Sequence, residues 1–167
     1  MRPVSDPSKE SLEVVVGNLL TAQKQTLAIA ESCTGGLITH RLTNVPGSSG
    51  YLVAGVIAYA YQAKVAALGV SWDTLNQFGA VSEETARAMA RGVRGKFSST
   101  LGLAVTGIAG PGGGTPEKPV GLTYLALADA SGEIVEQHIW RGDRAQNKSY
   151  SAEAALKLLR KYLERRD

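Results

Sequence analysis

Thr26-Leu27-Ala28-Ile29-Ala30 is a short apolar run, and Glu31-Ser32-Cys33-Thr34-Gly35-Gly36 follows it directly. An unbroken apolar run of this kind is typical of a strand that is covered on both faces of a sheet. Residues 37–42 then show the spacing of a helix. The stretch therefore predicts a buried strand, a tight glycine turn and the N-terminus of a helix, which together form the basic unit of an α/β fold.

Predicted helices and strands alternate on both sides of this unit. Upstream, Asp6 and Pro7 predict the start of a helix, and its single apolar stripe consists of Leu12, Val15, Val16, Leu19 and Leu20. Downstream, the pattern predicts buried strands at 52–60 and 101–105, helices at 62–68 and 72–78, a helix capped by Ser82, a hairpin of 120–128 and 134–140, and a last helix. We expect a three-layer α/β/α sandwich in one domain, residues 1–167, with a mixed, mostly parallel sheet and a late antiparallel hairpin.

Length and composition narrow the class of protein. At 167 residues the chain can bury one continuous core. The lone cysteine, Cys33, excludes an intramolecular disulfide and fits a reducing cytoplasm, and the polar first ten residues do not resemble a secretory signal. No apolar run reaches the length of a membrane span. His40 and His138 belong to no recognisable ligand cluster, so we expect no metal.

Basic residues gather at the end of the chain, at Lys157, Arg160, Lys161, Arg165 and Arg166. They indicate either a patch for phosphate or nucleic acid, or cations that complement the negative end of a helix dipole. No aromatic side chains lie between them as a base-stacking surface requires. We therefore favour the helix end and expect no nucleic-acid partner.

Ligands of open α/β sheets bind beyond the carboxyl ends of the strands, and three predicted loops leave strands there. In the turn from Ser32 to Gly36, the glycines let backbone N–H groups approach an anion or an oxyanion, next to the positive end of a helix. The same residues also fit a plain tight turn that Ser32 or Thr34 caps.

The second loop, residues 106–116, is rich in glycine and proline. Ordering such a loop costs conformational entropy, which favours contact with a ligand over a flexible surface loop. It lacks the Gly-Lys-Ser/Thr of a phosphate-binding Walker A motif. It also lacks the downstream acidic residue of a dinucleotide fingerprint.

The third loop contains Tyr59 and Lys64. A serine hydroxyl needs a neighbouring base to attack an amide, and neither histidine lies near a glycine turn. A partly buried lysine can serve, because desolvation frees its amine; otherwise Lys64 is a solvated helix residue. Tyr59 either donates to the reacting oxygen or packs in the core. Cys33 could be the nucleophile, but a small buried cysteine is the preferred interpretation.

Several of these motifs resemble the C-terminal domain of the competence/damage-inducible protein CinA. The resemblance rests on residues 30–36, on Val45-Pro46-Gly47-Ser48-Ser49, on residues 79–84 and on residues 106–121, in the family's order and spacing. It implies an α/β/α fold and the activity of stand-alone nicotinamide mononucleotide deamidases, which release ammonia and nicotinic acid mononucleotide. The nucleotide-pyrophosphatase domain of longer members has no room in this chain.

The resemblance also implies a site. Ser32 is the nucleophile, with Tyr59 and Lys64 as catalytic neighbours. The residues around the nucleotide substrate are Thr34, Gly35, Gly36, Ser48, Thr106, Gly107, Gly110 and Arg144. No cofactor and no membrane are implied, and the family suggests a homodimer. A non-catalytic module that binds a nucleotide or a partner is the alternative function.

Two positions depart from the family pattern. Ala60-Tyr61 replaces the Ser-Asn that often precedes the lysine, and Asn147 replaces an arginine that often follows Gly-Asp-Arg. If that arginine holds the nucleotide phosphate, Lys148 or Arg144 takes its place here, with weaker binding rather than lost chemistry.

Overall fold

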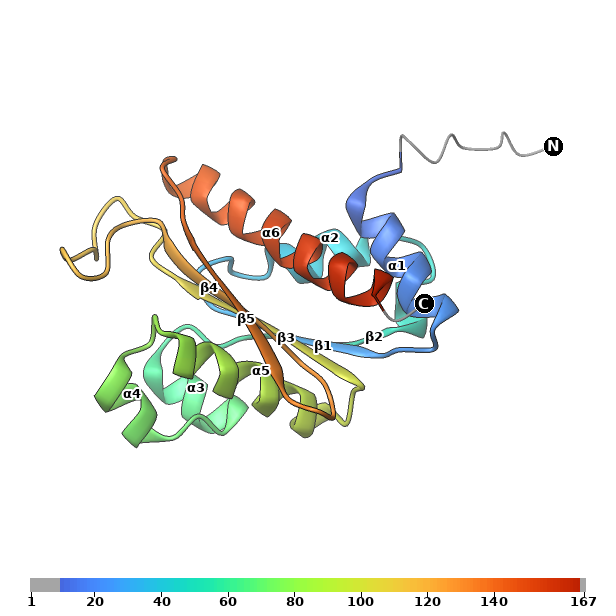
Figure 1. Cartoon of the computed structure of the whole chain (residues 1–167), viewed down its shortest axis with the longest axis horizontal. Helices are drawn as coiled ribbons and strands as arrows, with labels where there is room; N and C mark the ends of the chain where they lie inside the picture. Colours follow the sequence, from blue (N-terminus) through green and yellow to red (C-terminus); the bar gives the residue numbers. More distant parts are fainter. Residues whose placement is uncertain (1–9, 166–167) are drawn as a thin grey trace.

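The computed structural model describes residues 10–165 and shows one sheet between two layers of helices (Figure 1). The strand order is β2-β1-β3-β4-β5. In chain order the strands are β1 (Leu27–Glu31), β2 (Leu52–Ile57), β3 (Leu101–Gly107), β4 (Leu122–Ala128) and β5 (Glu133–Ile139). The expected three-layer α/β/α fold is confirmed.

The strand directions confirm a mixed, mostly parallel sheet. β1 pairs in parallel with β2 and with β3. β4 is antiparallel to both of its neighbours, β3 and β5, so it alone runs against the other described strands. The predicted hairpin is therefore confirmed, and the carboxyl ends of β1, β2, β3 and β5 meet at one edge of the sheet.

Two sets of helices cover the sheet (Figure 1). On one face lie α1 (Leu12–Ala22), α2 (Leu37–Thr43) and α6 (Arg144–Glu164), and on the other α3 (Tyr61–Leu68), α4 (Trp72–Phe78) and α5 (Glu83–Phe97). A short 3₁₀ turn, η2 (Ser48–Gly50), precedes β2. The predicted helix start at Asp6 and Pro7 lies outside the described residues; α1 begins at Leu12 after Ser11.

Alternation along the central strands divides the core in two. Ile29 and Leu103 belong to the buried cluster with α1 and α6, whereas Ala28 and Ala104 belong to the cluster with α5. Large side chains thus fill one face and small ones the other, which lets α5 pack closely on the sheet. Ser82 caps α5 as predicted, and its hydroxyl accepts a hydrogen bond from the backbone N–H of Thr85.

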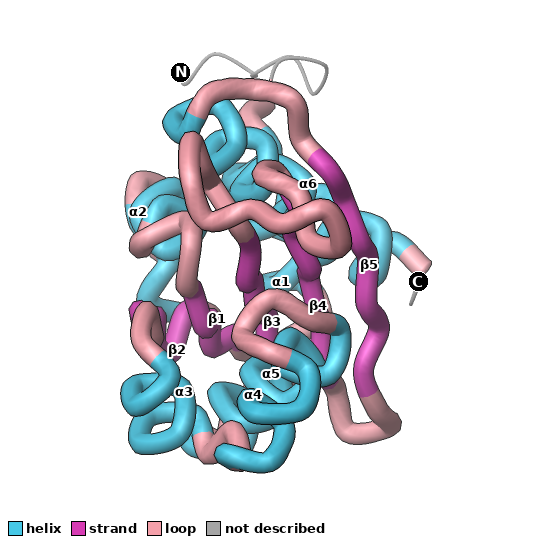
Figure 2. The backbone as a smooth tube through the Cα atoms, turned by 90° about the vertical axis from the view of Figure 1, so that its left-hand side faces the viewer, coloured by secondary structure: helices cyan, strands magenta, loops and turns pink. Residues whose placement is uncertain are grey.

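The prediction of a buried strand over residues 52–60 is wrong. β2 ends at Ile57 and forms one edge of the sheet, where β1 is its only strand neighbour among the described residues (Figure 2). Every second side chain from Val53 onward is exposed. Apolar composition predicted the strand, but composition does not distinguish an edge strand from a central one.

Candidate active site

The carboxylate of Glu31 holds the turn that carries Ser32. Glu31 is fully buried at the end of β1, and it accepts hydrogen bonds from the hydroxyls of Thr34 (2.6 Å) and Thr39 (2.7 Å). It also accepts from the backbone N–H groups of Ile38 and Thr39, both at 3.0 Å. These two groups lie in the first turn of α2, where no helical carbonyl can accept from them. Glu31 thus caps α2 from the neighbouring strand.

The turn itself requires glycine. Gly35 and Gly36 have φ angles of +61° and +99°, in the left-handed region that side chains disfavour. Among residues 10–165, no protein group accepts a hydrogen bond from the backbone N–H of Thr34 or Gly36. The turn therefore offers N–H donors, those of Thr34 and Gly36 among them, beside Ser32 at the N-terminus of α2, as an anion or oxyanion site needs.

Lys64, on α3, reaches the same turn. Its Nζ lies 3.1 Å from Ser32 Oγ, 2.8 Å from the carbonyl oxygen of Ala58 and 2.9 Å from that of Tyr59. The lysine is only 1% exposed, so the interpretation of Lys64 as a solvated helix residue is wrong. Burial disfavours the charged form and lowers the pKa of Lys64 to about 8.

These three contacts suit a neutral amine as well as an ammonium. A neutral amine donates to the two carbonyls and directs its lone pair at the hydroxyl of Ser32; the ammonium donates to all three oxygens. The pair can therefore exchange a proton without rearrangement. No carboxylate within the described chain forms an ion pair with Lys64, which leaves the neutral form accessible near pH 8.

Cys33 is the small buried cysteine that the sequence favoured. It is 6% exposed within the core cluster of α1 and α6. Burial raises the pKa of its thiol to about 11, so at neutral pH the sulfur is protonated and a poor nucleophile.

Tyr59 lies beside the site and not in the core. Its side chain is 60% exposed, and its hydroxyl accepts a hydrogen bond from Arg144 at 3.1 Å. Arg144, the first residue of α6, also donates to the carbonyl of Gly110 at 2.7 Å. Arg144 therefore connects the end of β2 to the loop after β3, two of the three segments expected at the site.

The last two residues of β3, Thr106 and Gly107, and the loop that follows β3 pack closely against their neighbours. The buried hydroxyl of Thr106 donates to the carbonyl of Ala80 at 2.8 Å. A Cβ on Gly107 would lie 3.1 Å from the sulfur of Cys33, and one on Gly110 only 2.5 Å from Val120. Gly107 and Gly110 are thus small because neighbouring residues pack closely on them, and any contact of theirs with a ligand has to come from the backbone.

The departure at Asn147 has a structural role. Asn147 is buried; its amide donates to the carbonyl of Ala109 at 3.0 Å and accepts from the backbone N–H of Gly142 at 2.9 Å. The next residue, Lys148, points to the site: its Nζ lies 3.7 Å from where a Cβ on Gly35 would be. Lys148 has no ion-pair partner among residues 10–165.

Lys148 lines an open hollow of about 410 Å³ together with Leu37, Arg144 and Ala145. Two cations and an apolar wall thus face one hollow beside the turn of Ser32. No carboxylate of the described chain pairs with either cation. An anionic group with an apolar or aromatic neighbour fits this lining.

Ser48 is the one expected site residue that lies elsewhere. It begins η2, before the first residue of β2, whereas Ser32 follows the last residue of β1. Because β1 and β2 are parallel, Ser48 and Ser32 lie at opposite ends of the strands. Within one chain Ser48 therefore does not join the site, although its motif is adjacent in sequence.

Sequence reasoning missed the role of Glu31. The one available signal is an acidic residue at the end of an otherwise apolar run, directly before the turn. A buried carboxylate is rare unless the protein satisfies it with hydrogen bonds. The position of Glu31 at the end of an apolar run therefore indicates a functional or capping role.

Glu31→Gln is expected to destabilise the protein by about 2–4 kcal/mol, because an amide nitrogen then faces N–H and O–H donors in a buried site. Urea denaturation measures the loss. Glu117→Gln is the matched control; Glu117 is exposed, and its change should cost less than about 0.5 kcal/mol. Equal effects of the two substitutions would show that the four contacts of Glu31 contribute nothing.

Among residues 10–165, no three His, Cys, Asp or Glu side chains gather closely enough to hold a metal ion. In the same part of the chain, no helix combines the length and apolar character needed to cross a membrane.

Known proteins are similar to this chain in sequence and in fold. The family model of the CinA C-terminal domain matches residues 9–163. A CinA-like protein of Syntrophus aciditrophicus is 52% identical over 155 residues, which cover 92% of this chain and 37% of that protein. A CinA-like protein of Syntrophotalea carbinolica is 50% identical, with 93% and 38% covered. The chain thus spans less than two-fifths of the length of these relatives.

Solved structures agree. The competence/damage inducible protein CihA of Agrobacterium tumefaciens is 39% identical with a TM-score of 0.83, and 92% of this chain and 95% of that one are covered. The competence damage-inducible protein A of Klebsiella pneumoniae is 29% identical with a TM-score of 0.89 and the same coverage. By family model, sequence and fold, the chain belongs to the CinA C-terminal domain family.

Proposed function

We propose that this chain hydrolyses the carboxamide of nicotinamide mononucleotide to nicotinic acid mononucleotide and ammonia. The observation that carries the proposal is the buried contact of 3.1 Å between Lys64 Nζ and Ser32 Oγ. A serine beside a buried lysine of lowered pKa is an activated nucleophile for acyl transfer. Membership of the CinA family and the two cations at the hollow support the choice of a phosphorylated amide.

In the first half of the reaction, Ser32 Oγ attacks the carboxamide carbon while Lys64 Nζ takes the hydroxyl proton. The carbonyl oxygen becomes an oxyanion, and the backbone N–H groups of Thr34 and Gly36 are the donors available to stabilise it. Tyr59 can add a third hydrogen bond, because its hydroxyl accepts from Arg144 and its own proton stays free. The C–N bond then breaks, and Lys64 returns its proton to the leaving nitrogen as ammonia forms.

In the second half, the same base acts on water. Lys64 takes a proton from the water molecule that attacks the acyl-enzyme carbonyl, and the carbon–Oγ bond breaks as that proton passes to Ser32. The carboxylic acid leaves and ionises, which restores the free hydroxyl and the neutral amine. No metal or cofactor takes part in these steps.

The hollow beside the turn fits the rest of the substrate. Lys148 and Arg144 supply positive charge for the phosphate, and Leu37 supplies an apolar wall. The two cations that the sequence offers for the phosphate, Lys148 and Arg144, both line this hollow. Asn147 instead holds the loop after β3, through its hydrogen bond to Ala109.

Ser32→Ala should lower ammonia release from nicotinamide mononucleotide at least about a thousandfold, because no other group can form the acyl-enzyme. A coupled glutamate dehydrogenase assay measures the ammonia. Cys33→Ala is the matched control: its thiol is adjacent but buried and protonated, so turnover should persist. Thermal stabilisation by the nucleotide without any ammonia release from the parent protein would favour a non-catalytic binding module instead.

The rate should depend on the ionisation of Lys64. The lysine acts as a base only when neutral, so kcat/KM should rise about tenfold per pH unit below the pKa of about 8 and level off above it. Lys64→Arg should be inactive across this range, because a guanidinium does not deprotonate. A flat rate between pH 6 and pH 9 for the parent protein would contradict a lysine base.

Lys148→Ala should raise KM for nicotinamide mononucleotide about tenfold or more, since one charge-assisted hydrogen bond to the phosphate is lost. Activity on nicotinamide riboside, which has no phosphate, should not change. Lys157→Ala, on the same helix but exposed and paired with Glu153, is the control and should leave KM unaltered. A similar loss on both substrates would show that Lys148 does not contact the phosphate.

A further inference from the structure

The helix that carries Lys64 is short and has no capping side chain. α3 has 8 residues, and Lys64 is the fourth of them. Ala60 is the N-cap residue and offers no side-chain acceptor to the N–H groups of the first turn. A serine, which the family often has at this position, would supply one. Because a helix of this length is marginal by itself, contacts with neighbouring elements have to hold α3 in place.

The C-terminal end of α3 packs directly on α5. Leu68 is the last residue of α3, and a Cβ on Gly92 of α5 would collide with its carbonyl oxygen. No side chain fits between the two helices at this point. The last turn of α3 is therefore held by backbone contact with α5.

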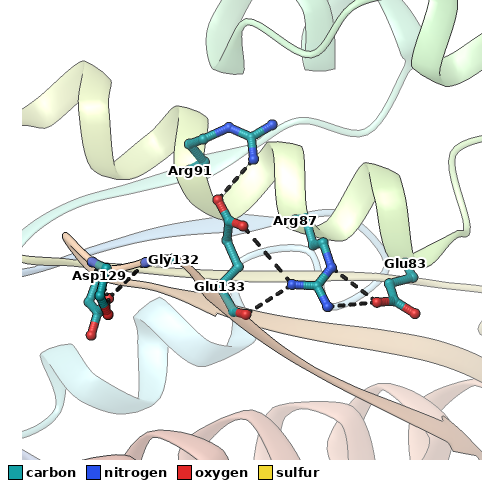
Figure 3. Close-up of polar contacts among 7 residues, drawn as sticks. Glu83, Arg87, Arg91, Asp129, Gly132 and Glu133 are labelled. Carbon is teal, nitrogen blue, oxygen red and sulfur yellow. Dashed lines mark hydrogen bonds and ion pairs between the residues drawn. The ribbon is translucent and has the colours of Figure 1, made fainter.

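α5 is itself fixed to the sheet. Arg87 and Arg91 both meet Glu133 at the start of β5 (Figure 3). Arg91 contacts the carboxylate of Glu133 at 2.8 Å, and Arg87 donates to its backbone carbonyl at 2.9 Å. Closer to the middle of the sheet, a Cβ on Gly102 of β3 would collide with the carbonyl oxygen of Ala90. α5 is thus a fixed support for the end of α3 that rests on it.

Tyr61, the first residue of α3, holds the other end. Its hydroxyl accepts a hydrogen bond from the backbone N–H of Ala80 at 3.2 Å. The carbonyl of Ala80 in turn accepts from the hydroxyl of Thr106 at 2.8 Å. The residue before Thr106 in β3, Val105, accepts from the backbone N–H of Ser32 at 3.2 Å. A series of hydrogen bonds thus connects the helix of the base with the residue that carries the nucleophile.

The segment that Tyr61 contacts is firmly held. The carbonyl of Gly79, next to Ala80, accepts from the hydroxyls of Ser82 at 3.0 Å and Thr85 at 2.7 Å. Both hydroxyls belong to the start of α5. Tyr61 therefore attaches the first turn of α3 to the same support that holds its last turn.

We propose that Tyr61 is a positioning residue, whose hydroxyl fixes the first turn of α3 and thereby the contact between Lys64 Nζ and Ser32 Oγ. The proposal rests on the proposed amidase function, in which this contact transfers the proton. Tyr61 and the contact of Leu68 with Gly92 restrain α3 at its first and last residues, and Lys64 lies between them. Tyr61 acts only through the helix, because its hydroxyl faces Ala80 and not the serine.

Loss of this hydroxyl should change the ionisation of the base. Burial lowers the pKa of Lys64 to about 8, and a looser α3 admits water to Nζ, which returns the pKa towards its higher ordinary value. Among the described residues, Cys33 is the titratable group whose charge acts on Lys64 from the turn, and its thiol is protonated; Glu31 faces α2. With a higher pKa, less of the amine is neutral at pH 7, whereas at high pH the neutral fraction is restored.

Tyr61→Phe removes the hydroxyl and keeps the ring. Its kcat/KM for nicotinamide mononucleotide should fall about threefold or more at pH 7 and equal that of the parent protein at pH 9.5, because the inflection of the profile moves upward. Tyr150→Phe is the matched control: Tyr150 is 43% exposed, against 39% for Tyr61, and its hydroxyl makes no hydrogen bond among residues 10–165. Its profile should match that of the parent, and circular dichroism verifies that both variants are folded.

The ionisation of Lys64 can also be followed without substrate, by nuclear magnetic resonance of protein labelled with ¹³C at the lysine ε carbons. The signal that is missing from Lys64→Arg belongs to Lys64. Its titration midpoint should lie about half a pH unit or more higher in Tyr61→Phe than in the parent and in Tyr150→Phe.

An unchanged midpoint in folded Tyr61→Phe, or an equal fall of its kcat/KM at pH 7 and pH 9.5, would overturn the positioning role. If none of the proteins releases ammonia, the proposed function fails. The midpoints of Lys64 then still decide whether Tyr61 controls the surroundings of the lysine.

Discussion

The buried carboxylate of Glu31 is the constraint on which the rest of the site depends. It receives four hydrogen bonds from Thr34, Ile38 and Thr39, so its negative charge is satisfied entirely by the turn and by the first turn of α2. A charge in the sheet would otherwise be costly. Because the strand that carries Glu31 is fixed by β2 and β3 on its two sides, the carboxylate also fixes where α2 begins and how Ser32 is presented.

The direction in which Glu31 points matters for Lys64. A carboxylate in contact with the amine would stabilise the ammonium and remove the base. Glu31 instead faces α2, and Lys64 meets only neutral oxygens, from Ser32, Ala58 and Tyr59. Glu31 and Lys64 are thus kept apart by their hydrogen-bond partners: Glu31 caps α2, and Lys64 is an amine whose pKa burial lowers to about 8.

Much of the fold follows from local pattern, and the errors have physical causes. Apolar runs, helical spacing and the cap at Ser82 predict nearly every element, because each depends on neighbouring residues. The edge position of β2 depends on strand order, which is a long-range property. The expectation that Ser48 lies at the site fails within one chain for the same reason. Its motif is close in sequence to Ser32, but the parallel pairing of β1 and β2 puts the two serines at opposite ends of the strands.

In the candidate site, too, some features follow from neighbouring residues and others depend on long-range packing. Glycines of the turn at residues 32–36 signal a special backbone, and the structure has φ of +61° and +99° there. Whether Lys64 is solvated or buried, and whether Asn147 faces a ligand or a loop, depends on how α3 and α6 pack. Helical spacing alone does not determine this, so the sequence left both residues open. The structure places Lys64 in contact with Ser32 and Asn147 in contact with the loop after β3.

The reversed direction of β4 has a consequence for the loop that joins it to β3. Because β3 and β4 are antiparallel neighbours, the segment that joins them starts and ends at the same edge of the sheet, above the turn of Ser32. Residues can be inserted or deleted there without altering the register of any strand. A change in the length of this loop thus leaves the strand that leads to Ser32 and the helix α3 that carries Lys64 where they are.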